Sequence, residues 1–177
     1  MKKLRLFGSV LALSIAGLSF RNPKNSIENL FDETSQSVSW GHVAHINSPA
    51  KSYGFYGCTA VIFDYGNEAL FSHALAGYDL IGINFRGRLD DRAPVNGYNV
   101  VERMVEESRK RGLNLRDCEA LIDAGNETEL RKILEDLNKE GIKVRKSKLW
   151  SVSNGTPIRR DVYFNPSRDL LVIRKTE

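Results

Sequence analysis

The sequence predicts an α+β fold, a sandwich in which β-sheets pack with two helices. Three observations support this class: strand patterns come in pairs joined by turns, two segments have helical periodicity, and these helices interrupt the strands without alternating with them. The chain has 177 residues, of which 41% are hydrophobic and 27% charged. This size and composition fit one globular domain and exclude a disordered or collagen-like chain.

The first strand patterns lie in the N-terminal half of the chain. Val38–Ile46 alternates apolar and polar residues and ends at the turn-forming residues Asn47-Ser48-Pro49. Thr59–Tyr65 is rich in β-branched and aromatic residues, and Glu68–Leu75 follows it after Gly66-Asn67. A glycine-containing pair between two such runs favours a tight turn, so these segments are expected to form a hairpin.

The two helices are expected in the C-terminal half. Asn99–Gly112 and Glu127–Glu140 carry apolar residues at helical spacing, with charges between them and a glycine at or just after the end. Cys118–Ala124 between them is expected to be a strand. Three further strands are expected towards the C-terminus, at Ile142–Val152, Ile158–Phe164 and Leu170–Arg174, the last two joined by a turn at Asn165–Asp169.

The N-terminal segment Met1–Phe20 has the layout of a secretory signal peptide. Lys2, Lys3 and Arg5 precede an apolar stretch that is short for a membrane span. We expect residues 21–37 to be a linker and residues 38–177 to form the domain. A functional signal would place the protein outside the cytoplasm, secreted or periplasmic, with no stable membrane span in the mature form. The alternatives are a membrane anchor and a cytoplasmic protein whose N-terminus packs on the domain.

The charge balance argues against nucleic acid as a partner. The chain has 26 basic and 22 acidic residues, and without the three bases of the signal-like segment 23 would face 22. Phosphate binding normally requires a concentrated basic surface. The cysteine content is also restrictive, because Cys58 and Cys118 allow at most one disulfide and no four-cysteine zinc site.

Cys58, His73 and Ser52 form the candidate catalytic set. A cysteine nucleophile needs a base for its proton, N–H groups for the oxyanion and a group that orients the base. Folding the hairpin about Gly66-Asn67 pairs Ala60 with His73, which brings the histidine opposite the residues just after Cys58. Cys58 directly follows Gly57, where the segment Tyr53–Cys58 is expected to be a loop that turns into the first strand of the hairpin. Ser52 lies six residues before the cysteine.

Less specific roles compete for the same residues. An isolated cysteine in a β-rich chain is usually a small buried hydrophobic residue, and an isolated histidine is usually exposed or hydrogen-bonded in the core. A zinc site formed by His42, Cys58 and His73 is a further alternative. Cys118 has acidic neighbours that would raise its pKa, which predicts inert packing. The short basic clusters, Arg159-Arg160 among them, are expected to lie on solvated faces.

Several motifs resemble a known enzyme family. Gly57–Val61 (GCTAV) and Ser72–Ala74 (SHA) resemble the chemoreceptor glutamine deamidases (CheD-like) and two toxin relatives, the cytotoxic necrotizing factor catalytic domain and the Burkholderia lethal factor. Val38–Pro49 resembles the opening strand of these enzymes and Asn154–Ile173 their closing hairpin. The resemblance covers Val38–Lys175 and implies a layered sandwich of mixed β-sheets with two helices.

The resemblance also implies roles for individual residues. Cys58 matches the nucleophile, His73 the base, and Ser52 the position of a threonine that helps to orient the histidine. The backbone N–H groups of Tyr56, Gly57 and Cys58 would then hold the oxyanion. The implied reaction is hydrolysis of a glutamine side-chain amide in a protein substrate to glutamate and ammonia through a thioester, without a cofactor.

Two features separate this chain from the chemoreceptor enzymes: Tyr56 stands where a small residue is usual, and the middle section lacks their glycine-rich loop. They favour a substrate other than a chemoreceptor. Two other functions use the same residues. A transglutaminase or another thiol amidase would use Cys58 and His73 with a different acceptor, and a non-catalytic binding module would bury Cys58 as a thiol of ordinary or raised pKa.

Overall fold

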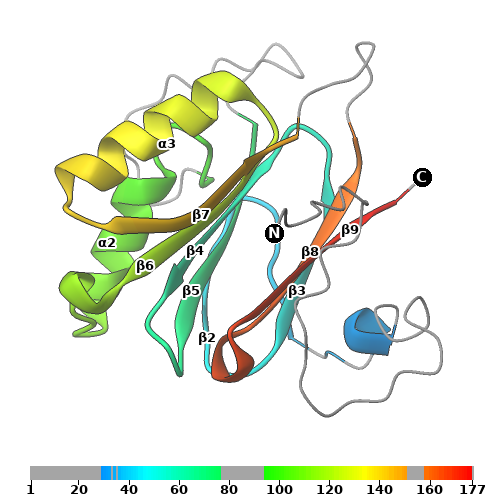
Figure 1. Cartoon of the computed structure of the whole chain (residues 1–177), viewed down its shortest axis with the longest axis horizontal. Helices are drawn as coiled ribbons and strands as arrows, with labels where there is room; N and C mark the ends of the chain where they lie inside the picture. The colour runs from blue at the N-terminus through cyan, green and yellow to red at the C-terminus, as the bar shows by residue number, and fades with distance from the viewer. Residues whose placement is uncertain (1–28, 33, 35, 77–93, 151–157, 177) are drawn as a thin grey trace, which may run out of the picture.

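The structure is a computed structural model of the chain, and it describes residues 29–32, 34, 36–76, 94–150 and 158–176. These residues form three layers: two helices, a five-stranded sheet and a four-stranded sheet (Figure 1). The described part of the chain is therefore an α+β sandwich with mixed sheets, as the element order predicted.

The five-stranded sheet lies in the middle layer. Its order is β2-β5-β4-β6-β7, and every neighbouring pair is antiparallel except β6 and β7, which are parallel. The parallel pair is possible because helix α3 connects its two strands. The strands are β2 Val43–Ile46, β4 Thr59–Asp64, β5 Ala69–Ala74, β6 Glu119–Ala124 and β7 Lys143–Leu149.

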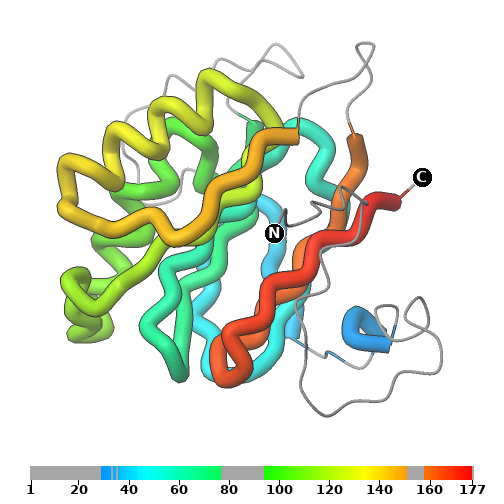
Figure 2. The backbone as a smooth tube through the Cα atoms, viewed as in Figure 1, coloured from blue at the N-terminus to red at the C-terminus, as the bar shows by residue number. Residues whose placement is uncertain are grey.

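The four-stranded sheet forms the outer layer, in the order β1-β3-β8-β9. β1 runs parallel to β3, whereas the other two pairs are antiparallel. The backbone trace shows β3 and β8 side by side although more than half of the chain separates them (Figure 2). The strands are β1 Gln36–Ser37, β3 Ala50–Phe55, β8 Arg160–Asn165 and β9 Leu170–Lys175.

Helices α2 Val100–Lys110 and α3 Glu127–Lys139 cover one face of the middle sheet (Figure 1). Their apolar sides and that face form one hydrophobic core, and the facing surfaces of the two sheets form a second core. Asn126 starts α3 by accepting a hydrogen bond from the Glu129 N–H. Short 3₁₀ helices, Leu115–Asp117 and Pro166–Arg168, lie between the larger elements.

The predicted hairpin and helices are confirmed, including the hairpin register. Ala60 pairs with His73 and Asp64 with Ala69, around a turn in which Gly66 adopts a φ of 92°. The expected strand at Cys118–Ala124 is observed as β6, and the three expected C-terminal strands are observed as β7, β8 and β9. The sequence pattern was sufficient for these elements because each helix has one apolar side, whereas β4 and β5 are buried on both faces and form short continuous apolar runs.

Two strand predictions were wrong in position. The strand expected at Val38–Ile46 is limited to Val43–Ile46 (β2), because Gly41 turns the chain with a φ of 71° and its N–H donates to the His73 carbonyl. Tyr53–Cys58 was expected to be a loop, but its first three residues belong to strand β3, Ala50–Phe55. Its small and polar residues hide the alternation that normally identifies a strand.

The expected signal segment Met1–Phe20 lies outside the described residues, and so does most of the expected linker. The end of that linker belongs to the folded body, because β1 pairs with β3 and Phe31 is fully buried against Tyr53 and Tyr163. Among the described residues, no helix is long and apolar enough to cross a membrane.

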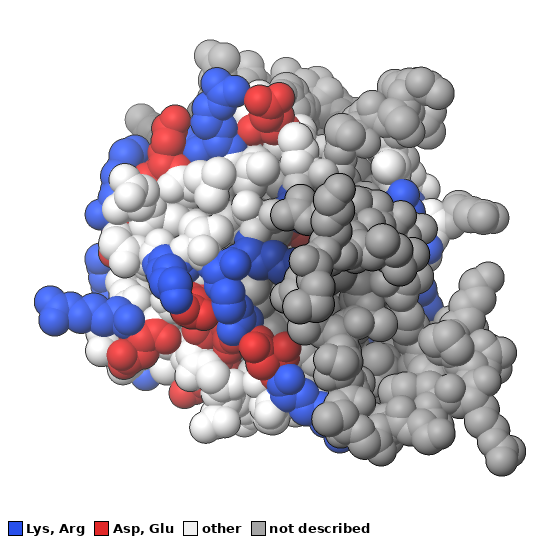
Figure 3. Space-filling model, viewed as in Figure 1, with Lys and Arg blue, Asp and Glu red and all other residues white. Residues whose placement is uncertain are grey.

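Charges of both signs mix along the exposed edge of β7 (Figure 3). Lys143 pairs with Glu119, while Arg145 lies within ion-pair distance of Asp64, Glu119 and Asp169. Charged side chains on an edge strand discourage pairing with the edge of another sheet.

Candidate active site

The candidate residues lie between the two sheets, near the end where β3 finishes and β4 begins. Ser52 and Phe55 come from β3, and His73 comes from β5. Cys58 lies directly before β4, after a turn formed by Tyr56 and Gly57. The loop-to-strand junction expected at Cys58 is therefore observed.

The hairpin register explains why Cys58 and His73 share a face. Ala60 is the cross-strand partner of His73, so both side chains lie on the side of the middle sheet that faces β3 and β8. Cys58 precedes Ala60 by two residues and packs on the same core as Ala60 and Phe71. The Cys58 thiol and the His73 imidazole therefore both lie in the core between the two sheets.

Ser52 binds the imidazole and determines which nitrogen carries its proton. The Ser52 Oγ lies 2.8 Å from Nδ1 of His73 and 2.7 Å from the carbonyl oxygen of Val38. A hydroxyl has only one hydrogen, and the carbonyl can only accept. The hydroxyl therefore donates to Val38 and accepts from Nδ1–H, which leaves Nε2 as the basic nitrogen.

A β-bulge in β3 directs two of its residues towards His73. Ser52 pairs with Val162, and Phe55 pairs with Arg160. Between these pairs β3 advances by three residues and β8 by two, so β3 contains one extra residue. The extra residue puts Ser52 and Phe55 on the same face, where a regular strand would separate them. Gly54 permits the bulge with a φ of 74°, and its N–H donates to Asp161 Oδ1 at 3.1 Å.

The imidazole of His73 is enclosed by aromatic rings. The Phe55 ring stacks on it with centroids 3.7 Å apart, and the Trp40 ring lies 5.8 Å away on an otherwise exposed residue. Burial, assisted by the nearby Arg160 charge, lowers the pKa of His73 to about 3. The ring is therefore neutral at physiological pH, and its buried Nε2 has no hydrogen-bond partner among the described residues.

Cys58 is partly buried, and its free thiol is protonated in the resting state. Burial raises its pKa, and the Glu129 carboxylate adds to this shift. Hydrogen bonds from the backbone N–H groups of Ala76 and Cys58, together with the Arg160 charge, act in the opposite direction. No hydrogen bond joins Sγ of Cys58 to Nε2 of His73 in the described part of the chain, although both residues lie on one face of the middle sheet.

The turn before Cys58 packs tightly against the start of α3. A Cβ added at Gly125 would lie 2.2 Å from the Gly57 carbonyl oxygen, so only glycine fits there. Because a trans peptide points its C=O and N–H in opposite directions, the Cys58 N–H faces away from Gly125, towards its own thiol. Cys58 and Ala76 therefore supply N–H groups near Sγ; Ala76 was missed because no local motif identifies it.

The expectation that Arg160 lies on a solvated face was wrong. Its side chain is fully buried, with Nε 2.8 Å from Asp123 Oδ2 and Nη2 3.0 Å from the carbonyl oxygen of Cys58. Arg160 points inwards because its neighbours two and four residues later, Val162 and Phe164, also face the core between the sheets. Exposed Arg159, in contrast, lies beside the Tyr56 ring.

Cys118 is buried in the core under the helices, as expected, and its pKa is raised to about 12. Burial is the main cause, and Asp64 and Glu119 contribute. His45 hydrogen-bonds to Glu68 at 2.6 Å. Within the described ranges, no three His, Cys, Asp or Glu side chains gather closely enough to hold a metal ion, so the proposed zinc set of His42, Cys58 and His73 is not assembled.

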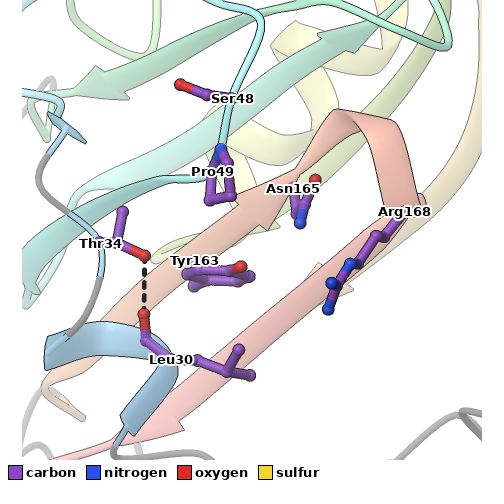
Figure 4. Close-up of a pocket in the computed structure, with 7 residues that line it drawn as sticks. All are labelled: Leu30, Thr34, Ser48, Pro49, Tyr163, Asn165 and Arg168. Atoms are coloured by element: carbon purple, nitrogen blue, oxygen red, sulfur yellow. Dashed lines mark hydrogen bonds between the residues drawn. The ribbon is translucent and has the colours of Figure 1, made fainter.

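A cavity of about 310 Å³ lies at the other end of the outer sheet (Figure 4). Tyr163 and Asn165 of β8 and Pro49, directly before β3, contribute to its lining. Its β8 residues are near the end of the strand opposite Arg160, so the cavity shares no residue with the candidate active site.

No protein-family model matches the chain, and no curated protein matches it either.

Proposed function

We propose that this protein is a cysteine-dependent amidohydrolase that deamidates glutamine side chains of a protein substrate. The observation that supports it most strongly is the pair of hydrogen bonds at the Ser52 hydroxyl, which define the tautomer of His73. Ser52 fixes the proton on Nδ1, and the basic Nε2, on the sheet face that Cys58 shares, has no hydrogen-bond partner within the described ranges. A histidine with this arrangement can accept a proton from a thiol.

In the proposed reaction, Nε2 of His73 takes the proton from Sγ of Cys58 as the sulfur attacks the side-chain carbonyl carbon of glutamine. The backbone N–H groups of Cys58 and Ala76, with those of Tyr56 and Gly57, are the candidate donors to the resulting oxyanion. The C–N bond then breaks, and His73 returns the proton to the departing ammonia. A thioester between Cys58 and the substrate remains.

Water completes the cycle. His73 takes a proton from a water molecule while the oxygen of that water adds to the thioester carbon, and the C–S bond then breaks as His73 returns the proton to the sulfur. The products are a glutamate side chain and the regenerated thiol, so the substrate protein gains one negative charge. Every group used in these steps belongs to the chain itself or to water.

The experiment that tests this function uses mixed proteins as substrates, since the target is not identified. The protein is incubated with a cell extract, and glutamine-to-glutamate conversion is measured by peptide mass spectrometry against Cys58→Ser. Conversion at specific sites that depends on Cys58 supports the proposal, and equal conversion with both proteins contradicts it. An added primary amine distinguishes transglutamination, because that reaction would attach the amine to the same glutamine.

One observation favours a second candidate, a non-catalytic binding module. The pKa of Cys58 is raised, which is what such a module would show. A raised thiol pKa is also compatible with catalysis when the base removes the proton during the attack. The two functions differ in whether His73 accelerates reactions of Cys58, and this difference is measurable without a substrate.

A further inference from the structure

The most deeply buried charged pair of this region, Arg160 with Asp123, contacts the backbone that carries the nucleophile. Both side chains are almost completely inaccessible, and the pair joins β8 of the outer sheet to β6 of the middle sheet. Breaking such a pair leaves an unpaired buried charge, whereas replacing both partners with apolar residues is often neutral. Burial of the pair therefore does not by itself show that it stabilises the fold.

The hydrogen bonds of the Arg160 guanidinium surround the turn before Cys58. Nη1 lies 3.3 Å from the carbonyl oxygen of Phe55, and Nη2 lies 3.0 Å from that of Cys58. Both bonds come from one planar group, whose fork geometry is rigid. Nε binds Asp123 at the same time, so the guanidinium is held in place while it fixes the two ends of the turn.

Asp123 is positioned by its own contacts. It is the cross-strand partner of Ala60, and it accepts hydrogen bonds from Arg160 and from the indole N–H of Trp150. Since Ala60 also pairs with His73, one short stretch of the middle sheet places both the base and the carboxylate that holds Arg160.

We infer that Arg160 and Asp123 are positioning residues that fix the direction of the Cys58 thiol relative to Nε2 of His73. This inference rests on the proposed function. The pair acts through the peptide groups at Phe55 and Cys58, and neither side chain takes part in the transfer of the proton.

The test measures alkylation of Cys58 by iodoacetamide at pH 6, in a Cys118→Ala background. Arg160→Lys keeps the positive charge but removes the planar guanidinium group. Asp123→Asn keeps the shape of the side chain but removes its negative charge. The double variant Arg160→Met with Asp123→Leu replaces the pair with apolar side chains. Arg174→Lys is the matched control, because Arg174 binds Asp161 on the neighbouring position of β8, at 2.9 Å. Thermal unfolding of every variant is recorded in parallel.

The inference predicts that the folded Arg160 and Asp123 variants lose about tenfold or more of the alkylation rate, while Arg174→Lys retains it within about twofold. An unchanged rate in folded Arg160→Lys or in the folded double variant would overturn the inference. If none of the three variants unfolds cooperatively, the pair is needed for the folded structure itself, and this result would also overturn the inference. His73→Phe keeps the two proposals separate: an unchanged rate in that variant would refute the proposed function itself.

Discussion

The hydroxyl of Ser52 lies 2.8 Å from Nδ1 of His73, and its own hydrogen is directed to the carbonyl of Val38. The bond joins the two sheets, because Ser52 belongs to β3 and His73 to β5. Its chemical consequence is that Nε2, and not Nδ1, is available as a base.

Removal of this hydroxyl should reduce the reactivity of Cys58. In Ser52→Ala the buried Nδ1–H loses its acceptor, so the ring can rotate or change tautomer. We expect alkylation of Cys58 at pH 6 to fall by about 10- to 100-fold. Ser52→Thr is the control that keeps the hydroxyl, and equal loss in both variants would contradict the role given to the Ser52 oxygen.

The stability of the protein should depend on pH through His73. Its pKa falls from an ordinary value of 6.5 to about 3 on folding, so between these values the unfolded chain holds a proton that the folded chain does not. Stability should therefore decrease as pH falls from 6.5 towards 3, with a contribution of up to about 1.4 kcal/mol per pH unit. Above pH 6.5 this contribution is constant.

Urea unfolding at several pH values measures this effect. His73→Phe keeps an aromatic ring against Phe55 but cannot be protonated, so its free energy of unfolding should vary less over the same range. The difference between the two curves isolates His73 from the carboxylates that also titrate there. If the free energies of unfolding of the two proteins varied with pH in the same way, His73 would not be held neutral by the fold.

The contact between Gly125 and Gly57 should be intolerant of a side chain. Gly125→Ala places a Cβ against the Gly57 backbone, so either the turn or the start of α3 has to move. We expect a loss of about 1–3 kcal/mol in the free energy of unfolding and a lower rate of Cys58 alkylation. Gly66→Ala is the control: its φ of 92° causes strain far from the site, with open space around the Cβ.

Gly66→Ala should therefore lower stability without changing the alkylation rate of Cys58. A Gly125→Ala protein with normal alkylation would show that the position of the Gly57 carbonyl is unimportant for the thiol.

The two cysteines should differ sharply in reactivity. Cys118 is only 3% exposed and its pKa is about 12, so iodoacetamide should modify Cys58 alone in the folded protein. Peptide mapping should find both thiols modified after unfolding in urea. Modification of Cys118 at a similar rate under native conditions would contradict the packing of the core beneath the helices.

Some of this site could be predicted from the sequence, and the physical reason differs between residues. The register of the hairpin follows from the position of the single turn at Gly66-Asn67, so the pairing of Ala60 with His73 was predictable. The Ser52 contact depended on the motif resemblance, because β3 has no clear alternation and is bulged at Gly54. Arg160 and Asp123 were not predictable, since their burial depends on pairing between strands distant in sequence.

The measurement that tests the central claim most directly is the pH dependence of Cys58 alkylation between pH 5 and 8, with and without His73. The pKa of His73 lies below this range and that of Cys58 above it, so the pair holds one transferable proton throughout. Removal of the thiol proton by Nε2 during the attack predicts a rate in Cys118→Ala that is nearly independent of pH over this range. His73→Phe in the same background should react more slowly, with a rate that rises about tenfold per pH unit as the free thiolate forms. Superimposable, rising profiles for the two proteins would contradict the assignment of His73 as the base for Cys58.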